Sequence, residues 1–175
     1  MRGDVILVGD EHRRAAGLIV DRLIEQVRAI ERRFTLTVAG ESGSGKSETG
    51  QALAEAFEER GLHAVVLQQD DYYVLPPKSN DAARRANRCW VGTTEVRLDL
   101  LDAHLEAAQA GAAEITKPLV IYDEDRIDEE VVSLTDARVV IAEGVYTSLC
   151  EHVDRRVFIA RNRLETLEHR LKRAR

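Results

Sequence analysis

A glycine-rich segment at residues 40–47 constrains this chain more than any other feature. It reads Gly40-Glu41-Ser42-Gly43-Ser44-Gly45-Lys46-Ser47, which matches G-x-x-x-x-G-K-[ST] at every fixed position. In this pattern, small residues turn successive backbone N–H groups inward around an anion. The lysine reaches the β- and γ-phosphates of a nucleotide, and the serine hydroxyl ligates Mg²⁺. The segment therefore predicts a phosphate-binding loop in which Lys46 contacts phosphate and Ser47 contacts the metal.

The residues on either side of the loop agree with this interpretation. Residues 34–39 read as a buried β-strand, and residues 47–60 read as a helix whose positive N-terminal end faces the phosphates. A glycine-rich linker is the alternative, but a linker does not require a strand before it and a helix after it. We therefore expect an α/β protein with the P-loop NTPase fold, built as three α/β/α layers around a mainly parallel sheet.

Composition limits the number of domains and the class of protein. With 175 residues, of which 44% are hydrophobic, the chain suits one domain with a substantial core. A net charge of −6 argues against binding nucleic acid through a general basic surface. The two cysteines are too few for a disulfide scaffold, and no run of 18 apolar residues is present. We expect a cytoplasmic protein that contacts neither nucleic acid nor membrane.

The first 33 residues predict an extension packed on a core domain of residues 34–175. Residues 5–8 are apolar enough for a short strand, and Asp10 is suited to cap a helix that runs to about residue 33. The apolar residues of that helix recur at the spacing of a single buried stripe: Ala16, Ile19, Val20, Leu23, Ile24, Val27 and Ile30. The stripe favours packing within the molecule, and a contact between copies in a homo-oligomer is the alternative.

Three carboxylates are predicted near the loop. Asp70 and Asp71 follow a continuous apolar strand at residues 64–67, and Glu143 lies near the end of another at residues 138–144. In open α/β sheets, ligands bind outside the carboxyl ends of the strands, so these side chains would share one crevice with the phosphates. Asp70 or Asp71 suits a general base or a metal ligand, with the capping of a turn as the alternative. Glu143 stands where P-loop enzymes place a second acidic partner of Mg²⁺.

The middle of the chain carries weaker signals. Residues 81–88 contain Arg84, Arg85 and Arg88 with little apolar content, which predicts a surface excursion whose arginines are either solvated or functional. Thr93 or Thr94 is suited to cap a helix that ends near residue 111.

The last third of the chain is expected to add strands and a basic tail. Residues 115–123 and 131–134 read as two strands on either side of an acidic turn, and residues 157–160 read as a further buried strand. Residues 161–175 predict a helix dense in cations, which either clamps phosphates or is exposed.

The order of these segments resembles the uridine kinase and phosphoribulokinase group of P-loop kinases over residues 35–173. Five segments carry the resemblance: the loop at 40–47, Gln69-Asp70-Asp71-Tyr72-Tyr73, Pro118 with Tyr122-Asp123, Val140-Ile141-Ala142-Glu143-Gly144-Val145, and Leu167-Glu168-His169-Arg170-Leu171-Lys172-Arg173. Each segment other than the loop is weak alone, but five in the right order are specific.

The resemblance implies an ATP- and Mg²⁺-dependent kinase that transfers the γ-phosphate to a hydroxyl of a small molecule. It implies that Asp70 is the base and that Lys46 is catalytic. Ser47 and Glu143, with Asp70, would hold Mg²⁺. The remaining expected contacts are Arg170 and Arg173 on the phosphates and Asp71, Tyr73, Tyr122 and Arg126 on the acceptor.

Two departures from the group bear on the acceptor. Glu124 and Ile127 stand near the positions where uridine kinases have a Phe and a His that contact the pyrimidine, and residues 89–92 lack the acid that meets a ribose. We therefore expect uridine and cytidine to be poor substrates and a polyol or an amine-bearing acceptor to be better. The alternative function is a nucleotide-binding switch or regulatory module without kinase activity. Neither an Asn-Lys-x-Asp nor a Leu-Ser-Gly-Gly element is present to support it.

Overall fold

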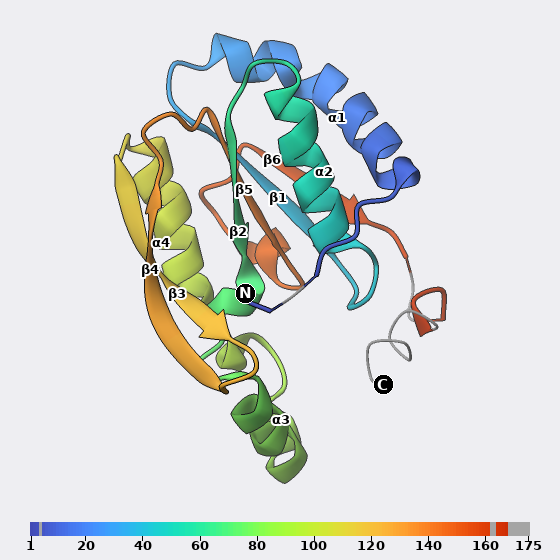
Figure 1. Ribbon diagram of the computed structural model, residues 1–175, viewed down its shortest axis with the longest axis vertical. Coiled ribbons are helices and arrows are strands. Elements are labelled where there is room, and N and C mark those ends of the chain that lie inside the picture. The colour runs from blue at the N-terminus through green and yellow to red at the C-terminus, as the bar shows by residue number, and fades with distance from the viewer. Residues whose placement is uncertain (4, 162–163, 168–175) are drawn as a thin grey trace.

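A four-stranded parallel sheet forms the centre of the protein in the computed structural model, which describes residues 1–3, 5–161 and 164–167 (Figure 1). Its strand order is β2-β5-β1-β6. The strands are β1 (Phe34–Gly40), β2 (Ala64–Gln68), β5 (Val139–Gly144) and β6 (Arg155–Ile159). β5 pairs with both β1 and β2 and therefore lies between them. β1 and β2 follow one another along the chain but are not neighbours in the sheet. The expectation of an α/β fold with a mainly parallel sheet is confirmed.

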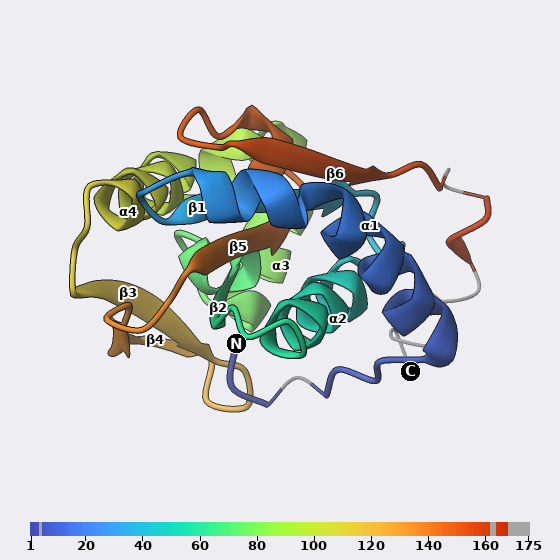
Figure 2. The same ribbon diagram turned by 90° about the horizontal axis from the view of Figure 1, so that it is seen from above.

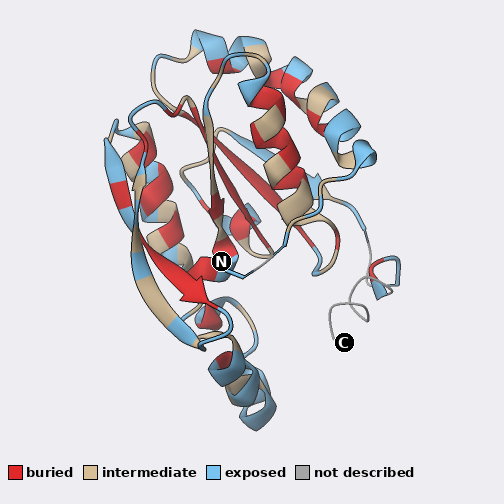
Figure 3. Ribbon diagram, in the orientation of Figure 1, coloured by how far each residue is buried: buried red, intermediate tan, exposed pale blue. Residues whose placement is uncertain are grey.

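Every residue of β1 and β5 is buried, because helices cover both faces of the sheet (Figure 3). Phe34, Leu36 and Val38 point to one face and pack with helices α1 (Asp10–Ala29) and α2 (Lys46–Glu58). On the other face, Val140 and Ala142 of β5 pack with helix α4 (Leu98–Gln109). Figure 2 shows α1 and α2 on one side of the sheet and α4 on the other. The sequence of such a strand need not alternate between apolar and polar residues, because neither of its faces meets solvent.

The N-terminal segment differs from its expected form. Residues 5–8 form no strand, and the side chains of Val5 and Leu7 are exposed. Instead, Arg2 makes a single parallel bridge with Ile121. Gly9, not Asp10, occupies the cap position of α1, so that Asp10 lies in the first turn, where its negative charge favours the helix dipole.

Helix α1 lies against α2 and ends earlier than expected. It runs to Ala29, where the predicted helix ran to about residue 33. The part of the apolar stripe that is fully buried consists of Ala16, Val20, Leu23 and Val27.

An antiparallel hairpin, β3 (Glu114–Ile121) and β4 (Arg126–Ser133), packs beside α4. The acidic run was expected to form a turn, but Asp128, Glu129 and Glu130 lie within β4. The physical reason is a cross-strand ion pair, since Lys117 of β3 stands opposite Glu130 with 3.0 Å between Nζ and the carboxylate. Opposite charges on facing strands favour extension of the ladder into the acidic run.

The segment between β2 and α4 also corrects the sequence interpretation. Helix α3 (Pro77–Ala86) begins with a proline in its first turn, where the missing N–H costs nothing. Helix α4 starts at Leu98, and neither Thr93 nor Thr94 caps it, because residues 93–95 form a separate 3₁₀ turn.

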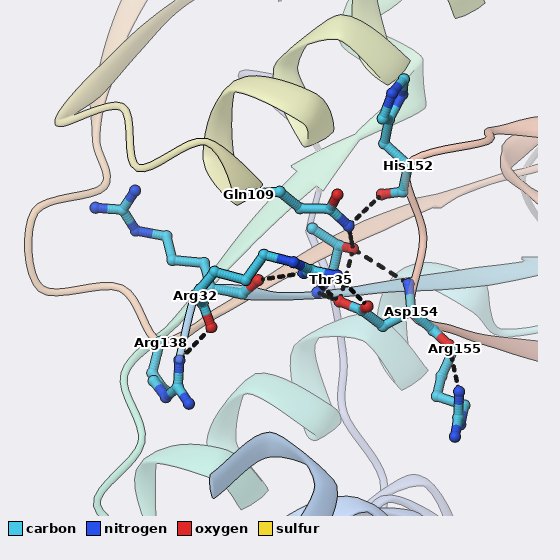
Figure 4. Close-up of polar contacts among 8 residues, drawn as sticks. Arg32, Thr35, Gln109, Arg138, His152, Asp154 and Arg155 are labelled. Atoms are coloured by element: carbon cyan, nitrogen blue, oxygen red, sulfur yellow. Dashed lines mark hydrogen bonds and ion pairs between the residues drawn. The ribbon is translucent and has the colours of Figure 1, made fainter. Parts of the chain in front are cut away.

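A polar cluster joins the beginning of β1 to the beginning of β6 (Figure 4). The Asp154 carboxylate accepts hydrogen bonds from both terminal nitrogens of Arg32, at 2.9 and 2.7 Å, and from the Thr35 backbone N–H at 2.9 Å. Gln109, the last residue of α4, donates to the Thr35 hydroxyl at 2.7 Å. The cluster links the amino ends of β1 and β6 to the last residue of α4, at the end of these strands that lies away from the phosphate loop.

In the part of the chain that the structure describes, no helix combines the length and the apolar character needed to cross a membrane.

Candidate active site

The loop between β1 and α2 has the backbone that a phosphate site requires. Gly43 and Gly45 adopt φ of 75° and 92°, a region that favours glycine, and Gly45 is the residue before helix α2. A Cβ at Gly40 would lie 2.9 Å from the Ser44 hydroxyl and 3.1 Å from the Ile159 carbonyl oxygen. The glycines therefore allow both the turn and the close approach of the loop to β6.

The loop presents polar groups toward an anion. Lys46 is the first residue of α2, where the helix dipole is positive, and its Nζ donates to the Glu41 carbonyl at 2.9 Å. The Ser44 hydroxyl oxygen is buried and makes no hydrogen bond to any described residue. A helix N-terminus with a lysine and a tight glycine loop fits the phosphates of a nucleotide.

Ser47 and Glu143 meet between α2 and β5. The Ser47 hydroxyl donates to a Glu143 carboxylate oxygen at 3.0 Å, and Glu143 is only 3% exposed. Burial and, to a smaller extent, the negative charge of Asp70 raise the pKa of Glu143 to about 7, against the hydrogen bond from Ser47, which lowers it. Ionisation of this buried carboxylate costs free energy, and a cation bound nearby would favour its ionised form.

These oxygen ligands fit Mg²⁺. The ion prefers hard oxygen donors and is usually held by one or two carboxylates together with substrate phosphates and water. Within the described ranges, no group of three or more His, Cys, Asp or Glu side chains is arranged to hold a metal by itself. Ser47 and Glu143 therefore provide part of a site that phosphate oxygens would complete.

Asp70 lies on a short 3₁₀ helix, η1 (Gln69–Tyr72), which follows β2. Asp70 borders a cavity of about 460 Å³ together with Lys46, Ser47 and Glu143. The neighbouring Gln69 is buried and accepts a hydrogen bond from the Tyr146 backbone N–H at 2.7 Å. The structure thus brings the loop, the expected base and the expected metal ligand to one cavity at the carboxyl ends of the parallel strands.

Tyr73 and Tyr122 also border this cavity. Burial and, to a smaller extent, the charge of Asp70 raise the pKa of Tyr73 to about 12. Its phenol therefore stays protonated at neutral pH and can donate a hydrogen bond.

Asp71 and Arg126, two further expected acceptor contacts, do not border this cavity. The Asp71 side chain is 2% exposed and accepts hydrogen bonds from Lys117 Nζ at 2.7 Å and from the Val120 backbone N–H at 3.0 Å. Arg126 forms ion pairs with Glu124 at 2.9 Å and Asp128 at 2.6 Å on the hairpin. Arg170 and Arg173 lie outside the described residues.

Sequence reasoning missed a polar cluster on the wall of the cavity. Glu95 is 1% exposed, and Arg84 Nε and Nη2 donate to its two carboxylate oxygens at 2.6 and 2.9 Å. Asn80 Nδ2 donates to Glu95 at 3.1 Å, and the indole N–H of Trp90 donates to Asn80 at 2.7 Å. The available signal was the i, i+4 spacing of Asn80 and Arg84 after Pro77, which places both on one helix face. No pattern pointed to Glu95.

Known proteins match both the sequence and the fold. A profile of the Phosphoribulokinase / Uridine kinase family matches residues 35–173. The chain is 29% identical over 171 residues to a bifunctional alpha-galactosidase/sucrose kinase of Mediterraneibacter gnavus, a match that covers 88% of the chain and 18% of that protein. It is also 29% identical over 112 residues to a uridine kinase of Leuconostoc citreum (strain KM20), covering 64% of the chain and 52% of that protein. The chain thus spans about half or less of the length of these relatives.

Among solved structures, a crystal structure assigned to a fructose transport system kinase from Silicibacter sp. TM1040 matches with a TM-score of 0.72 and 18% identity. The match covers 91% of this chain and 81% of that chain. At this identity the likeness shows a shared fold.

Proposed function

The chain belongs to the Phosphoribulokinase / Uridine kinase family, and from this premise we propose that it is an ATP- and Mg²⁺-dependent phosphotransferase. It moves the γ-phosphate to a hydroxyl group of a small molecule. The observation that carries the proposal is the single cavity bordered by Lys46, Ser47, Asp70 and Glu143. A donor-binding loop, a pair of metal-binding oxygens and a separate carboxylate in one cavity are the parts that phosphoryl transfer needs.

The proposed mechanism gives each residue one task. The backbone of the loop and the N-terminus of α2 bind the β- and γ-phosphates, and Lys46 supplies positive charge to them. Ser47 and Glu143 would hold Mg²⁺, which when bound neutralises charge that develops on the phosphate oxygens. Asp70 accepts the proton of the acceptor hydroxyl while that oxygen bonds to the γ-phosphorus. The bond from the γ-phosphorus to the bridging oxygen breaks, and ADP leaves with that electron pair.

The fit of Glu143 to this task is electrostatic. Its carboxylate and that of Asp70 repel each other, which contributes to the raised pKa of Glu143. A divalent cation beside Glu143 would relieve both the desolvation and this repulsion.

Asp70→Asn tests the proposal. The amide preserves size but cannot accept a proton, so phosphoryl transfer should fall by about 10²- to 10⁴-fold while the affinity for ATP stays within a few-fold of wild type. ADP release and equilibrium binding of ATP measure the two effects separately. Asp81→Asn on the exposed face of α3 is the control and should change neither. Equal losses of transfer and of ATP binding would make Asp70 a metal ligand or a structural residue instead.

The acceptor is proposed to be a hydroxyl compound other than a pyrimidine nucleoside. A pocket that selects a base must supply hydrogen bonds to its polar edge, and a site without those partners discriminates poorly. Glu124, near a pyrimidine-contacting position of uridine kinases, is instead paired with Arg126 on the hairpin. A kcat/KM for uridine of about 10⁴ M⁻¹s⁻¹ or above would contradict this part of the proposal.

A further inference from the structure

Arg84 borders the cavity, and a buried carboxylate holds it in place. Arg84 projects from α3, borders the cavity and has a side chain that is 38% exposed. Two of its nitrogens are committed to Glu95 in a bidentate contact, and its guanidinium carbon lies 5.5 Å from the centre of the Tyr73 ring. A bidentate contact on one side and an aromatic ring on the other fix the plane of the guanidinium group.

Glu95 has no capacity left for a ligand. One carboxylate oxygen accepts from Arg84 Nη2 at 2.9 Å and from the Gly92 backbone N–H at 3.4 Å. The other accepts from Arg84 Nε at 2.6 Å and from Asn80 Nδ2 at 3.1 Å. Both oxygens therefore have two donors each, which fills the usual capacity of a carboxylate. Glu95 positions Arg84 and does not contact the acceptor.

Arg84 retains donors for a ligand. Its Nε and Nη2 hold Glu95, and Nη2 also donates to the Tyr73 hydroxyl at 3.4 Å, while Nη1 makes no hydrogen bond or ion pair with any described residue. The two N–H groups of Nη1 thus remain as donors on a side chain that borders the cavity. A fork with a fixed plane selects oxygen acceptors by direction as well as by charge.

The charges on the wall of the cavity favour a neutral ligand. Glu95 offsets the charge of Arg84, and Asp70 adds a negative charge to the same wall, so an anionic acceptor would meet no net attraction there. Tyr73, Tyr122 and Tyr146 supply aromatic surface to the cavity. Hydroxyl oxygens can accept from Arg84 and donate to Asp70, and the C–H faces of a sugar ring can pack on tyrosine.

We propose that Arg84, positioned by Glu95, is the specificity-determining residue for the acceptor, and that the acceptor is a neutral polyhydroxy compound of about monosaccharide size. The size follows from a cavity of about 460 Å³ that must also hold the phosphate end of the donor. This inference rests on the proposed kinase activity and specifies the substrate class of the same site.

The first experiment compares Arg84→Gln with Arg85→Gln. Arg85 is the next residue of α3, is exposed and pairs only with Asp81 among the described residues. The probes are D-fructose, D-glucose and D-ribose as neutral acceptors, with D-glycerate and uridine as the anionic and the flat-base comparisons. Wild type should phosphorylate at least one sugar better than either comparison compound. Arg84→Gln should raise KM for that sugar by about 10- to 100-fold, the value of a hydrogen bond to a charged group.

Three further readouts separate a specificity role from a structural one. KM for ATP should change by less than about twofold in Arg84→Gln, and Arg85→Gln should match wild type throughout. Arg84→Lys keeps the charge but lacks the fork, so it should not restore the wild-type KM for the sugar. Glu95→Gln removes the offsetting charge, so kcat/KM for D-glycerate relative to the sugar should rise by about tenfold or more. Thermal unfolding of each variant shows whether the fold is retained.

The outcomes distinguish this inference from the proposed function. An unchanged KM for the sugar in a folded Arg84→Gln overturns the inference, as does a wild-type preference for D-glycerate or uridine. If Arg84→Gln does not fold, Glu95→Gln decides. An unchanged ratio of kcat/KM for D-glycerate to kcat/KM for the sugar in that variant overturns the inference. Transfer to one of the comparison compounds, abolished by Asp70→Asn, would leave the proposed function standing. Transfer to none of the five compounds overturns the inference, and binding of ATP without transfer to any hydroxyl would overturn both.

Discussion

Glu143 is the residue whose chemistry depends most on what binds beside it. It is almost fully buried, it accepts a hydrogen bond from Ser47, and its pKa is raised to about 7 by burial and by Asp70. A glutamate in the unfolded chain has a pKa of 4.5. The native protein without a cation therefore keeps a proton on Glu143 over a range of pH in which the unfolded chain has lost it.

This difference predicts how stability depends on pH in the absence of Mg²⁺. Between about pH 4.5 and 7, the native state binds more protons than the unfolded state, so the contribution of Glu143 to the free energy of unfolding falls as pH rises. The fall amounts to about 3 kcal/mol and is complete above pH 7, where both states are ionised. Urea denaturation in EDTA at a series of pH values should show it as a difference between wild type and Glu143→Gln. Parallel curves for the two proteins would contradict it.

At the scale of elements, the hairpin β3–β4 is attached to the catalytic segment through the buried Lys117 and the Val120 backbone N–H, which both donate to Asp71. Lys117 Nζ lies 2.7 Å from Asp71 on η1, 3.0 Å from Glu130 on β4 and 3.1 Å from the Pro118 carbonyl oxygen. Asp71 directly follows the proposed base, Asp70. The ion pair therefore sets the position of η1 relative to the hairpin that carries Tyr122 toward the cavity.

Lys117→Met should destabilise the protein by about 1–3 kcal/mol, because it removes one of the two cations that pair with the buried Asp71 carboxylate, the other being the N-terminal amino group of Met1 at 3.0 Å. Asp71→Asn added to Lys117→Met should cost less than the sum of the two single changes, since neither partner is then left charged and buried. Chemical denaturation of the four proteins measures this coupling. Arg126→Met, an exposed ion-paired residue of the same hairpin, should cost only about 0–1 kcal/mol. Additive losses for Lys117 and Asp71 would exclude the coupling.

The helices and strands that could be predicted are those that their own local sequence determines. β1, α2 and β5 were placed within a few residues because an apolar run, a glycine loop and buried strands leave few alternatives. β4 was missed in part because its acidic residues are stabilised by Lys117 on another strand, which local propensity does not contain. For the same reason, the apolar residues 5–8 predicted a strand that has no partner in the described structure.

The candidate site divides in the same way. The phosphate loop, Asp70, Glu143, Tyr73 and Tyr122 border one cavity, and the roles expected of them stay predictions. Asp71 was assigned to the acceptor, but adjacent residues on a 3₁₀ turn point in different directions, and Asp71 faces Lys117. The Arg84–Glu95 pair was not found because its members lie on different short segments that meet only in the folded chain.

At the scale of the whole molecule, binding of ATP should be measurable as added stability. A ligand at 100 times its Kd that binds only the native state adds about 2.7 kcal/mol to the free energy of unfolding. With Mg²⁺ and a non-hydrolysable ATP analogue at this concentration, wild type should gain that amount. Lys46→Ala should gain little, because its charge faces the phosphates. Thermal or urea unfolding with and without the analogue provides the measurement.

The matched control for this prediction is Lys78→Ala. Lys78 is a lysine of α3 whose Nζ donates to the Asp123 carbonyl, and its side chain does not border the cavity. It should respond to the analogue as wild type does. The same gain in Lys46→Ala as in wild type would show that the loop does not bind the phosphates.

The strand order β2-β5-β1-β6 has a consequence for how the chain folds as it is synthesised. β1 and β2 pair with each other nowhere, and both wait for β5, whose first residue, Val139, pairs with Phe34 and Ala64. A ribosome adding about 5–20 residues per second takes about 5 to 20 seconds to make the hundred or so residues between Phe34 and Val139. During that time β1 and β2 lack the strand that pairs with both of them. Their apolar residues then rely on chaperones, or on helices already made, for cover until β5 enters between them.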